Sequence, residues 1–108
     1  MEITETPILE IALSAEKEKS LLIDNDKKIE EIVKALSSST RRKILAQIQS
    51  EPADVSKIAS NLNMTEANIS AQIKKLEKAG LIECSYSSGQ HGVRKISRLK
   101  YNKLIIKF

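Results

Sequence analysis

Side chains that can form hydrogen bonds with nucleic-acid bases are concentrated in residues 65 to 75. Asn68 and Gln72 carry amides, which can pair with adenine through two hydrogen bonds, and Lys75 carries a cation that can pair with guanine. Together with Ser70, they are the candidates for reaching base edges. The expected outward set is small, amide-bearing and cationic, which suits a DNA major groove about 12 Å wide. Its members are Glu66, Ala67, Asn68, Ser70, Ala71, Gln72, Lys74 and Lys75.

An amphipathic helix over residues 65 to 78 is predicted to hold these side chains. Thr65 stands just before it as a good N-cap residue. Ile69, Ile73 and Leu76 repeat at i, i+4 and i+7, so they form an apolar stripe that can face a core. Turning this stripe inward leaves the hydrogen-bonding residues outward.

A shorter amphipathic helix is predicted directly before it, beginning after the N-cap residue Asp54. Residues 61 to 64 leave room only for a tight corner, in which Met64 is expected to fill the space between the helices. Such a pair is typical of a helix-turn-helix, whose second helix enters the major groove. The first helix is expected to bury Val55, Ile58, Ala59 and Leu62.

Two antiparallel strands are predicted next, over residues 81 to 86 and 93 to 99, with residues 87 to 92 as their loop. Gly80 suits the left-handed position just past a helix end. Arg94 and Lys95 flank the loop, where a cation can follow the phosphate backbone or enter the minor groove. His91 at the tip can touch the same groups, and plain exposure to solvent is its alternative.

Several other polar residues have two interpretations. Ala67 and Ala71 can lie against thymine methyl groups, whereas Glu66 can accept from a cytosine amine or serve only the helix dipole. Arg41 and Arg42 begin a helix, where the macrodipole disfavours cations, so each needs a partner. That partner is expected to be an acidic residue of the protein or a DNA phosphate.

Two helices are predicted before the helix-turn-helix. Asp26 is taken as the N-cap of the first, and Ser39 or a neighbouring hydroxyl as the cap of the second, which ends at Glu51 and Pro52. The expected apolar face of the first comprises Ile29, Ile32, Val33 and Leu36, and that of the second comprises Ile44, Leu45 and Ile48.

Strands are predicted at both ends of the chain. Residues 8 to 23 contain two short apolar runs that favour a hairpin over the competing helix from Ile8 to Leu22. Residues 101 to 108 form a further strand, and its apolar edge needs a partner. The alternatives are the N-terminal segment, the wing, or the same strand of a second subunit.

Residues 35 to 45, ALSSSTRRKIL, and residues 56 to 83, SKIASNLNMTEANISAQIKKLEKAGLIE, resemble the ArsR-like winged helix-turn-helix transcription regulators, particularly small archaeal-type members. The resemblance covers residues 27 to 108. It implies a dimeric DNA-binding fold of three helices and a β-wing, with residues 65 to 78 as the recognition helix. The paired cysteines of metal-sensing members would fall in residues 54 to 62, which contain no Cys. A metal-sensing role is therefore not carried over.

Charge is distributed unevenly along the chain. Residues 1 to 36 hold 5 Lys and 9 Asp or Glu, a balance of −4, and residues 37 to 108 hold 13 Lys or Arg and 5 acids, a balance of +8. The cationic charge thus belongs to the helix-turn-helix and the segment after it, as expected for a part that meets phosphate.

The composition argues against other classes of protein. One Cys and one His in 108 residues offer neither a nucleophile with its base nor a closed metal site, so no enzymatic activity, cofactor or metal is predicted. No apolar run reaches the roughly 18 residues that span a bilayer, and with no intrachain disulfide available a cytoplasmic protein is expected. Cys84 is interpreted as a small apolar residue, with a redox sensor as its alternative.

We therefore predict an α+β, mostly α, winged helix-turn-helix fold. Residues 1 to 26 are expected to form an N-terminal dimerisation segment, and residues 27 to 108 the DNA-binding domain. The predicted function is sequence-specific binding of double-stranded DNA by a homodimer that regulates transcription. The alternatives are a winged-helix protein-interaction module and a redox- or ligand-responsive DNA-binding switch.

Overall fold

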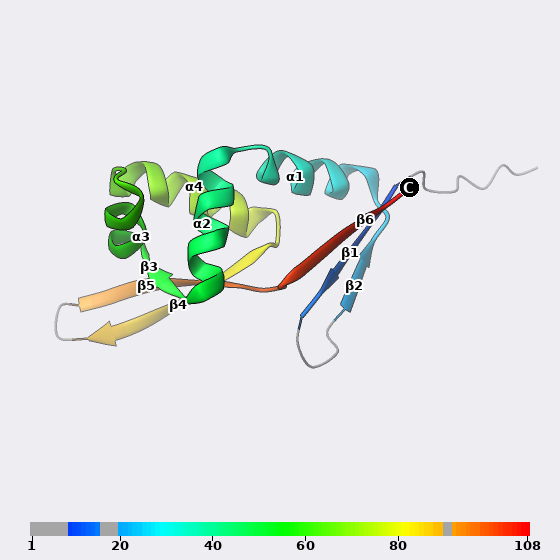
Figure 1. Cartoon of the computed structure of the whole chain (residues 1–108). Helices are drawn as coiled ribbons and strands as arrows, with labels where there is room; N and C mark the ends of the chain where they lie inside the picture. Colours follow the sequence, from blue (N-terminus) through cyan, green and yellow to red (C-terminus); the bar gives the residue numbers. More distant parts are fainter. Residues whose placement is uncertain (1–8, 16–19, 90–91) are drawn as a thin grey trace, which may run out of the picture.

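The computed structural model describes residues 9–15, 20–89 and 92–108, and Figure 1 shows the arrangement of its helices and strands. The helices are α1 (Asp26–Leu36), α2 (Ser39–Ser50), α3 (Val55–Leu62) and α4 (Glu66–Lys78). The strands are β1 (Glu10–Ser14), β2 (Ser20–Ile23), β3 (Ala53–Asp54), β4 (Ile82–Gly89), β5 (Gly92–Leu99) and β6 (Lys103–Lys107). One sheet has the order β3-β5-β4 and the other β2-β1-β6. The predicted α+β winged helix-turn-helix fold is confirmed.

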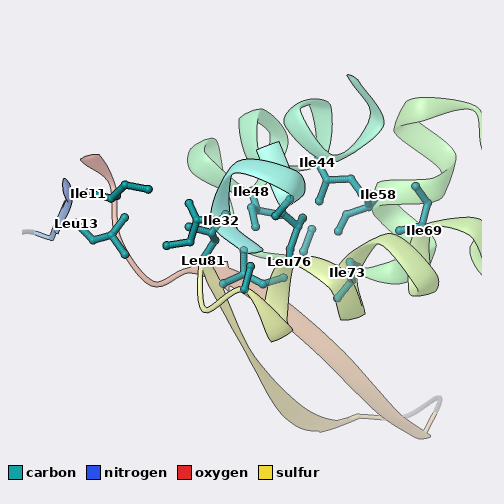
Figure 2. Packing of buried hydrophobic residues seen from close by; sticks show 14 of the residues in the cluster. Ile11, Leu13, Ile32, Ile44, Ile48, Ile58, Ile69, Ile73, Leu76 and Leu81 are labelled. Carbon is teal, nitrogen blue, oxygen red and sulfur yellow. The ribbon is translucent and has the colours of Figure 1, made fainter. Parts of the chain in front are cut away.

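Aliphatic side chains from all four helices form the core (Figure 2). Ile69, Ile73 and Leu76 of α4 are fully buried, so the predicted apolar stripe does face inward. Of the expected residues of α3, Ile58 and Ala59 are buried, whereas Val55 and Leu62 are half-buried at the edge of the core. The roll of α4 about its own axis is thereby fixed, and with it the set of side chains that face outward.

Each helix begins with a side chain that caps a backbone N–H three residues later. Asp54 accepts from the amide of Lys57 at 2.8 Å, and Thr65 from that of Asn68 at 3.1 Å, as predicted. Ser38 caps α2. The expectation for α1 is wrong by one residue, because Asn25 is the cap. Asp26 lies in the first turn, where its charge complements the helix dipole.

The ends of α3 and α4 share one backbone geometry. Asn63 has a φ of 56° and Gly80 a φ of 79°, and the helix stops at each of these left-handed residues. After α4 the amide of Leu81 donates to the carbonyl of Leu76 at 3.1 Å, and after α3 the amide of Met64 donates to Ala59 at 2.9 Å. These bonds satisfy carbonyls that a helix end leaves free, and the bond of Met64 lies in the sharp turn between α3 and α4.

The wing is the hairpin of β4 and β5, and its strands are longer than predicted. Pairing continues from Ile82 opposite Leu99 to Gly89 opposite Gly92, so most of the expected loop at residues 87 to 92 is strand. β3 pairs with β5 and ties the start of α3 to the base of the wing. β3 is not predicted from the sequence, because a strand of two residues has no periodicity.

A second sheet combines both ends of the described chain. The predicted N-terminal hairpin is confirmed as β1 and β2, and the C-terminal strand takes the first of its three expected partners, because β6 pairs with β1. Ile11 lies opposite Ile23 on one side and Ile106 on the other. Ile11 and Leu13 are buried in one cluster with residues of α1, including Ile32 (Figure 2).

Large exposed apolar side chains gather on this terminal sheet and on α1. Val33, expected on the buried face of α1, is instead 45% exposed, and Ala35 is buried. The others are Leu21 and Leu22 of β2, Ile105 and Ile106 of β6, and Phe108 just after β6. Because β6 completes a sheet with β1 and β2, the N-terminal segment and the C-terminus form one structural unit, while the division at residue 26 stays a prediction.

Candidate nucleic-acid interface

The predicted contact residues of α4 occupy the part of the helix that the buried stripe of Ile69, Ile73 and Leu76 leaves outward. Asn68, Lys74 and Lys75 are exposed, whereas Ser70 and Gln72 are half-buried. Within the described residues neither lysine forms an ion pair, so their charges remain available to phosphates. Thr65, Glu66, Ala67 and Ala71 are also exposed.

The amides on this face are joined in a chain of hydrogen bonds. Gln72 Oε1 accepts from Arg41 Nη1 at 2.7 Å, and Gln72 Nε2 donates to Asn68 Oδ1 at 3.1 Å. Asn68 Nδ2 in turn lies 3.8 Å from the sulfur of Met64, a weak acceptor. Gln72 and Asn68 are therefore held in one orientation by partners within the protein.

Arg41 and Arg42 belong to the first turn of α2, but both donate hydrogen bonds to the C-terminal end of α1. Arg41 donates from Nε to the carbonyl of Ala35 at 2.7 Å and from Nη2 to that of Lys34 at 2.9 Å. Arg42 donates to the carbonyl of Leu36 at 2.8 Å. The expected acidic partner is wrong for the part of the chain described, since both cations instead donate to carbonyls in the last turn of α1, at the negative end of its dipole.

The two helices of the motif are also joined at their N-terminal ends. The hydroxyl of Ser56 in α3 donates to the carboxylate of Glu66 in the first turn of α4. Glu66 therefore has a partner within the protein and also lies where a helix dipole favours an acid. Its contact with a cytosine stays a prediction.

Both predicted wing cations are paired with acids outside the wing, one at the cap of α3 and one on α4. Arg94 Nη1 lies 3.1 Å from Asp54 Oδ2, and Lys95 Nζ lies 3.4 Å from Glu77 Oε1. Arg94 and Glu77 are largely exposed, whereas the Asp54 carboxylate is mostly covered. His91 falls outside the described residues, so its predicted role at the tip stays a prediction.

An open cleft of about 690 Å³ separates the wing from the helix pair. Both signs of charge line it, so it has no single electrostatic preference. Its lining residues are Asp54, Val55, Ser56, Lys57, Glu66, Ser70, Val93, Arg94 and Lys95. The cleft lies between the two elements that the sequence predicts to contact DNA.

Cys84 is a half-buried residue of β4, with its sulfur 3.5 Å from the hydroxyl of Ser97. Burial raises the pKa of the Cys84 thiol above its ordinary value, and the hydrogen bond with Ser97 opposes that shift. The thiol is therefore less often ionised at neutral pH than a free cysteine, which lowers its reactivity.

Within the described ranges no three His, Cys, Asp or Glu side chains come together in a way that could hold a metal ion. The same ranges contain no helix that is both long and apolar enough to cross a membrane.

Comparison with known proteins gives matches to one family. Residues 38–83, from the cap of α2 to the start of the wing, match the family model described as bacterial regulatory protein, arsR family. No curated protein matches the chain.

Solved structures of the same kind share the fold. The homodimeric winged helix-turn-helix DNA-binding domain of a possible ArsR-family transcriptional regulator from Mycobacterium bovis is 26% identical, with a TM-score of 0.61. That match covers 68% of this chain and 64% of the other, just under two thirds of the relative's length. An ArsR family transcriptional regulator is 28% identical over 70% of this chain and 74% of the other, with a TM-score of 0.59.

One further structure is a sensor. The cadmium metal-sensor CMTR from Mycobacterium tuberculosis is 25% identical, with a TM-score of 0.54, over 66% of this chain and 69% of the other. The present chain has one Cys in its sequence, and that residue lies on β4 of the wing.

Proposed function

We propose that this chain is a DNA-binding transcriptional regulator of the ArsR family, whose model matches residues 38–83 and whose solved relatives share its winged helix-turn-helix fold, and that it occupies its operator as a homodimer. In this proposal α4 enters the major groove, and the wing contacts the backbone beside it. The archaeal type of the resemblance stays a prediction.

The observation that carries the proposal is the chemistry of the outward face of α4. The face carries amides, a hydroxyl and two lysines that have no acidic partner in the described part of the chain. Among the described residues, none of the large exposed apolar side chains lies on α4. A protein-docking face needs such an apolar patch. The polar face therefore supports DNA as the partner over the interaction module.

Within this interface the residues divide into two roles. Asn68, Ser70, Gln72 and Lys75 are the proposed base contacts, with Ala67 and Ala71 against thymine methyls. Lys74, His91, Arg94 and Lys95 are the proposed backbone contacts, which add affinity without reading sequence. Thr65 and Glu66 support the start of α4 and lie next to the same groove.

The proposed homodimer rests on apolar surface away from the DNA face. Val33 of α1 and the exposed leucines and isoleucines of β2 and β6 are apolar side chains that a lone domain leaves in water. The Mycobacterium bovis relative is described as homodimeric. A two-fold axis through this surface would place two α4 helices about 34 Å apart on a pseudo-palindrome.

Two measurements test the proposal. Genome-wide recovery of bound fragments should yield one pseudo-palindromic motif, and DNA recovered without any shared motif would contradict sequence-specific binding. Light scattering at micromolar concentration should give twice the 12.0 kDa of one chain. A single 12.0 kDa species both with and without DNA would count against the dimer.

A further inference from the structure

We propose that Arg41 is a positioning residue for base recognition, which fixes the amide orientations of Gln72 and Asn68 so that both present N–H donors to the major groove. Arg41 lies outside the recognition helix and is not itself a proposed base contact. The inference rests on the proposed function, because it requires α4 to be the helix that meets the bases.

The guanidinium of Arg41 is held by the end of α1 before it reaches α4. Two of its nitrogens donate to the carbonyls of Ala35 and Lys34, at 2.7 and 2.9 Å. Both carbonyls lie in the last turn of α1, which leaves its final carbonyls free for such partners. With two anchors in one planar group, the remaining nitrogen Nη1 has a fixed direction toward Gln72.

Arginine is a donor without an acceptor, so its contact determines which end of the Gln72 amide faces it. Rotating that amide by half a turn would place its NH₂ group against Nη1, with two donors facing each other. Gln72 Oε1 therefore stays on Arg41, and Gln72 Nε2 points along the helix to Asn68 Oδ1. The NH₂ group of Asn68 is then directed away from Gln72, toward the sulfur of Met64.

This fixed orientation determines which base edges the pair can match. An unconstrained Gln or Asn pairs with adenine by accepting from N6 and donating to N7. Here Gln72 Oε1 accepts from the Arg41 cation, and Asn68 Oδ1 accepts from Gln72. The groups that remain available to a base are therefore the unbonded N–H donors of the two amides. Donors match guanine, which presents two acceptors in the major groove, or the O4 of thymine. We infer that the operator position read by Gln72 is guanine or thymine.

The test uses the full-length protein and the operator recovered from bound fragments. The position read by Gln72 is identified as the one whose base preference disappears in Gln72→Ala. Dissociation constants are then measured for all four base pairs at that position, with the wild type, Arg41→Ala and Arg42→Ala. Arg42 is the matched control because it also donates to the end of α1 but, among the described residues, forms no hydrogen bond or ion pair with α4.

The wild type should prefer guanine or thymine at this position by about tenfold. Arg41→Ala should reduce that preference to within about twofold, while preferences at positions that neither Gln72 nor Asn68 reads persist. Arg42→Ala should leave it intact. Because Arg41→Ala removes two bonds to α1 and can unfold the protein, Arg41→Gln is the second variant. Its amide can donate or accept, so Gln72 becomes free to turn and adenine should become tolerated.

Other outcomes separate this inference from the proposed function. Specific binding with adenine preferred at the Gln72 position of the wild type would overturn the role of Arg41 and leave the family function standing. An unchanged preference in folded Arg41→Ala or Arg41→Gln would do the same. A wild type without any base preference would remove the proposed sequence-specific function itself.

Discussion

Helix α4 and the wing are both proposed to contact DNA, but they are built differently. The inner residues Ile69 and Ile73 of α4 are fully buried, and its outer amides are bonded to one another and to Arg41. The wing beyond its base is exposed, with Val93 68% accessible, and Arg94 and Lys95 are paired with Asp54, the cap of α3, and Glu77 of α4. One element thus holds oriented neutral donors, and the other holds charges that already have partners.

That difference assigns the two roles. Reading a base needs a donor or acceptor in a fixed place, and a side chain on a helix with a buried stripe provides it. Following a phosphate backbone needs only a cation that can exchange one anionic partner for another. We therefore expect changes in α4 to alter folding or specificity, and changes in the wing to alter affinity for any DNA.

The largest expected effect is loss of the buried side of α4. Ile73→Ala removes a fully buried side chain and should lower the free energy of unfolding by about 2 to 5 kcal/mol. Val93→Ala on the wing should change it by less than about 0.5 kcal/mol, because that side chain is mostly in water. Urea unfolding at one fixed protein concentration measures both. Equal losses would mean that the wing is as much a part of the core as α4.

The sequence predicted these helices well because their signals are local. Asp54, Thr65 and Gly80 act through bonds within a few residues, so their roles could be assigned without a fold. Asn25 and Asp26 are adjacent and both suit a cap, and no local rule chooses between them. The wrong cap of α1 has this cause. The wrong burial of Val33 has another, because burial depends on which elements cover the helix.

The interface was predicted less completely because its partners are distant in sequence. Arg94 contacts Asp54 across 40 positions, and Arg41 contacts Gln72 across 31. The helix dipole showed that Arg41 needs a partner, but only the packing of α1 against α2 determines that this partner is a carbonyl end together with an amide of α4. A pattern of types and spacing can predict which residues are polar and outward, but not which of them are already bonded.

A smaller effect is expected at the outer side of α4. Gln72→Ala removes a proposed base contact, so it should cost about 1 to 3 kcal/mol at the operator and little at random DNA. Titrations of both DNAs at several salt concentrations measure this, with thermal unfolding as the check on folding. If the variant binds both DNAs equally less well, Gln72 contributes to affinity and not to reading.

The wing should behave in the opposite way. Arg94→Ala removes a proposed phosphate contact, so it should weaken binding to operator and random DNA alike and lower the slope of log K against log salt by about one unit. The same titrations measure it. An Arg94→Ala variant with unchanged affinity and slope would show that the cation remains on Asp54 in the complex, and the anchoring role would then be wrong.

The smallest effect is expected from a variant that tests whether Asp54 and a DNA phosphate compete for Arg94. Asp54→Asn keeps a side-chain oxygen to cap α3, since Asn caps as well as Asp, but removes the charge that holds Arg94 at 3.1 Å. An ion pair with one exposed partner is worth about 0.2 to 1 kcal/mol, so its release should raise affinity for operator and random DNA by no more than about fivefold. Glu30→Gln removes an equal charge from an exposed pair on α1, away from α4 and the wing, and controls for net charge. If the affinity for DNA rises equally in both variants, the change in net charge explains the effect. If the affinity rises only in Asp54→Asn, and the rise is absent from the double variant with Arg94→Ala, then Arg94 leaves Asp54 and binds a DNA phosphate in the complex.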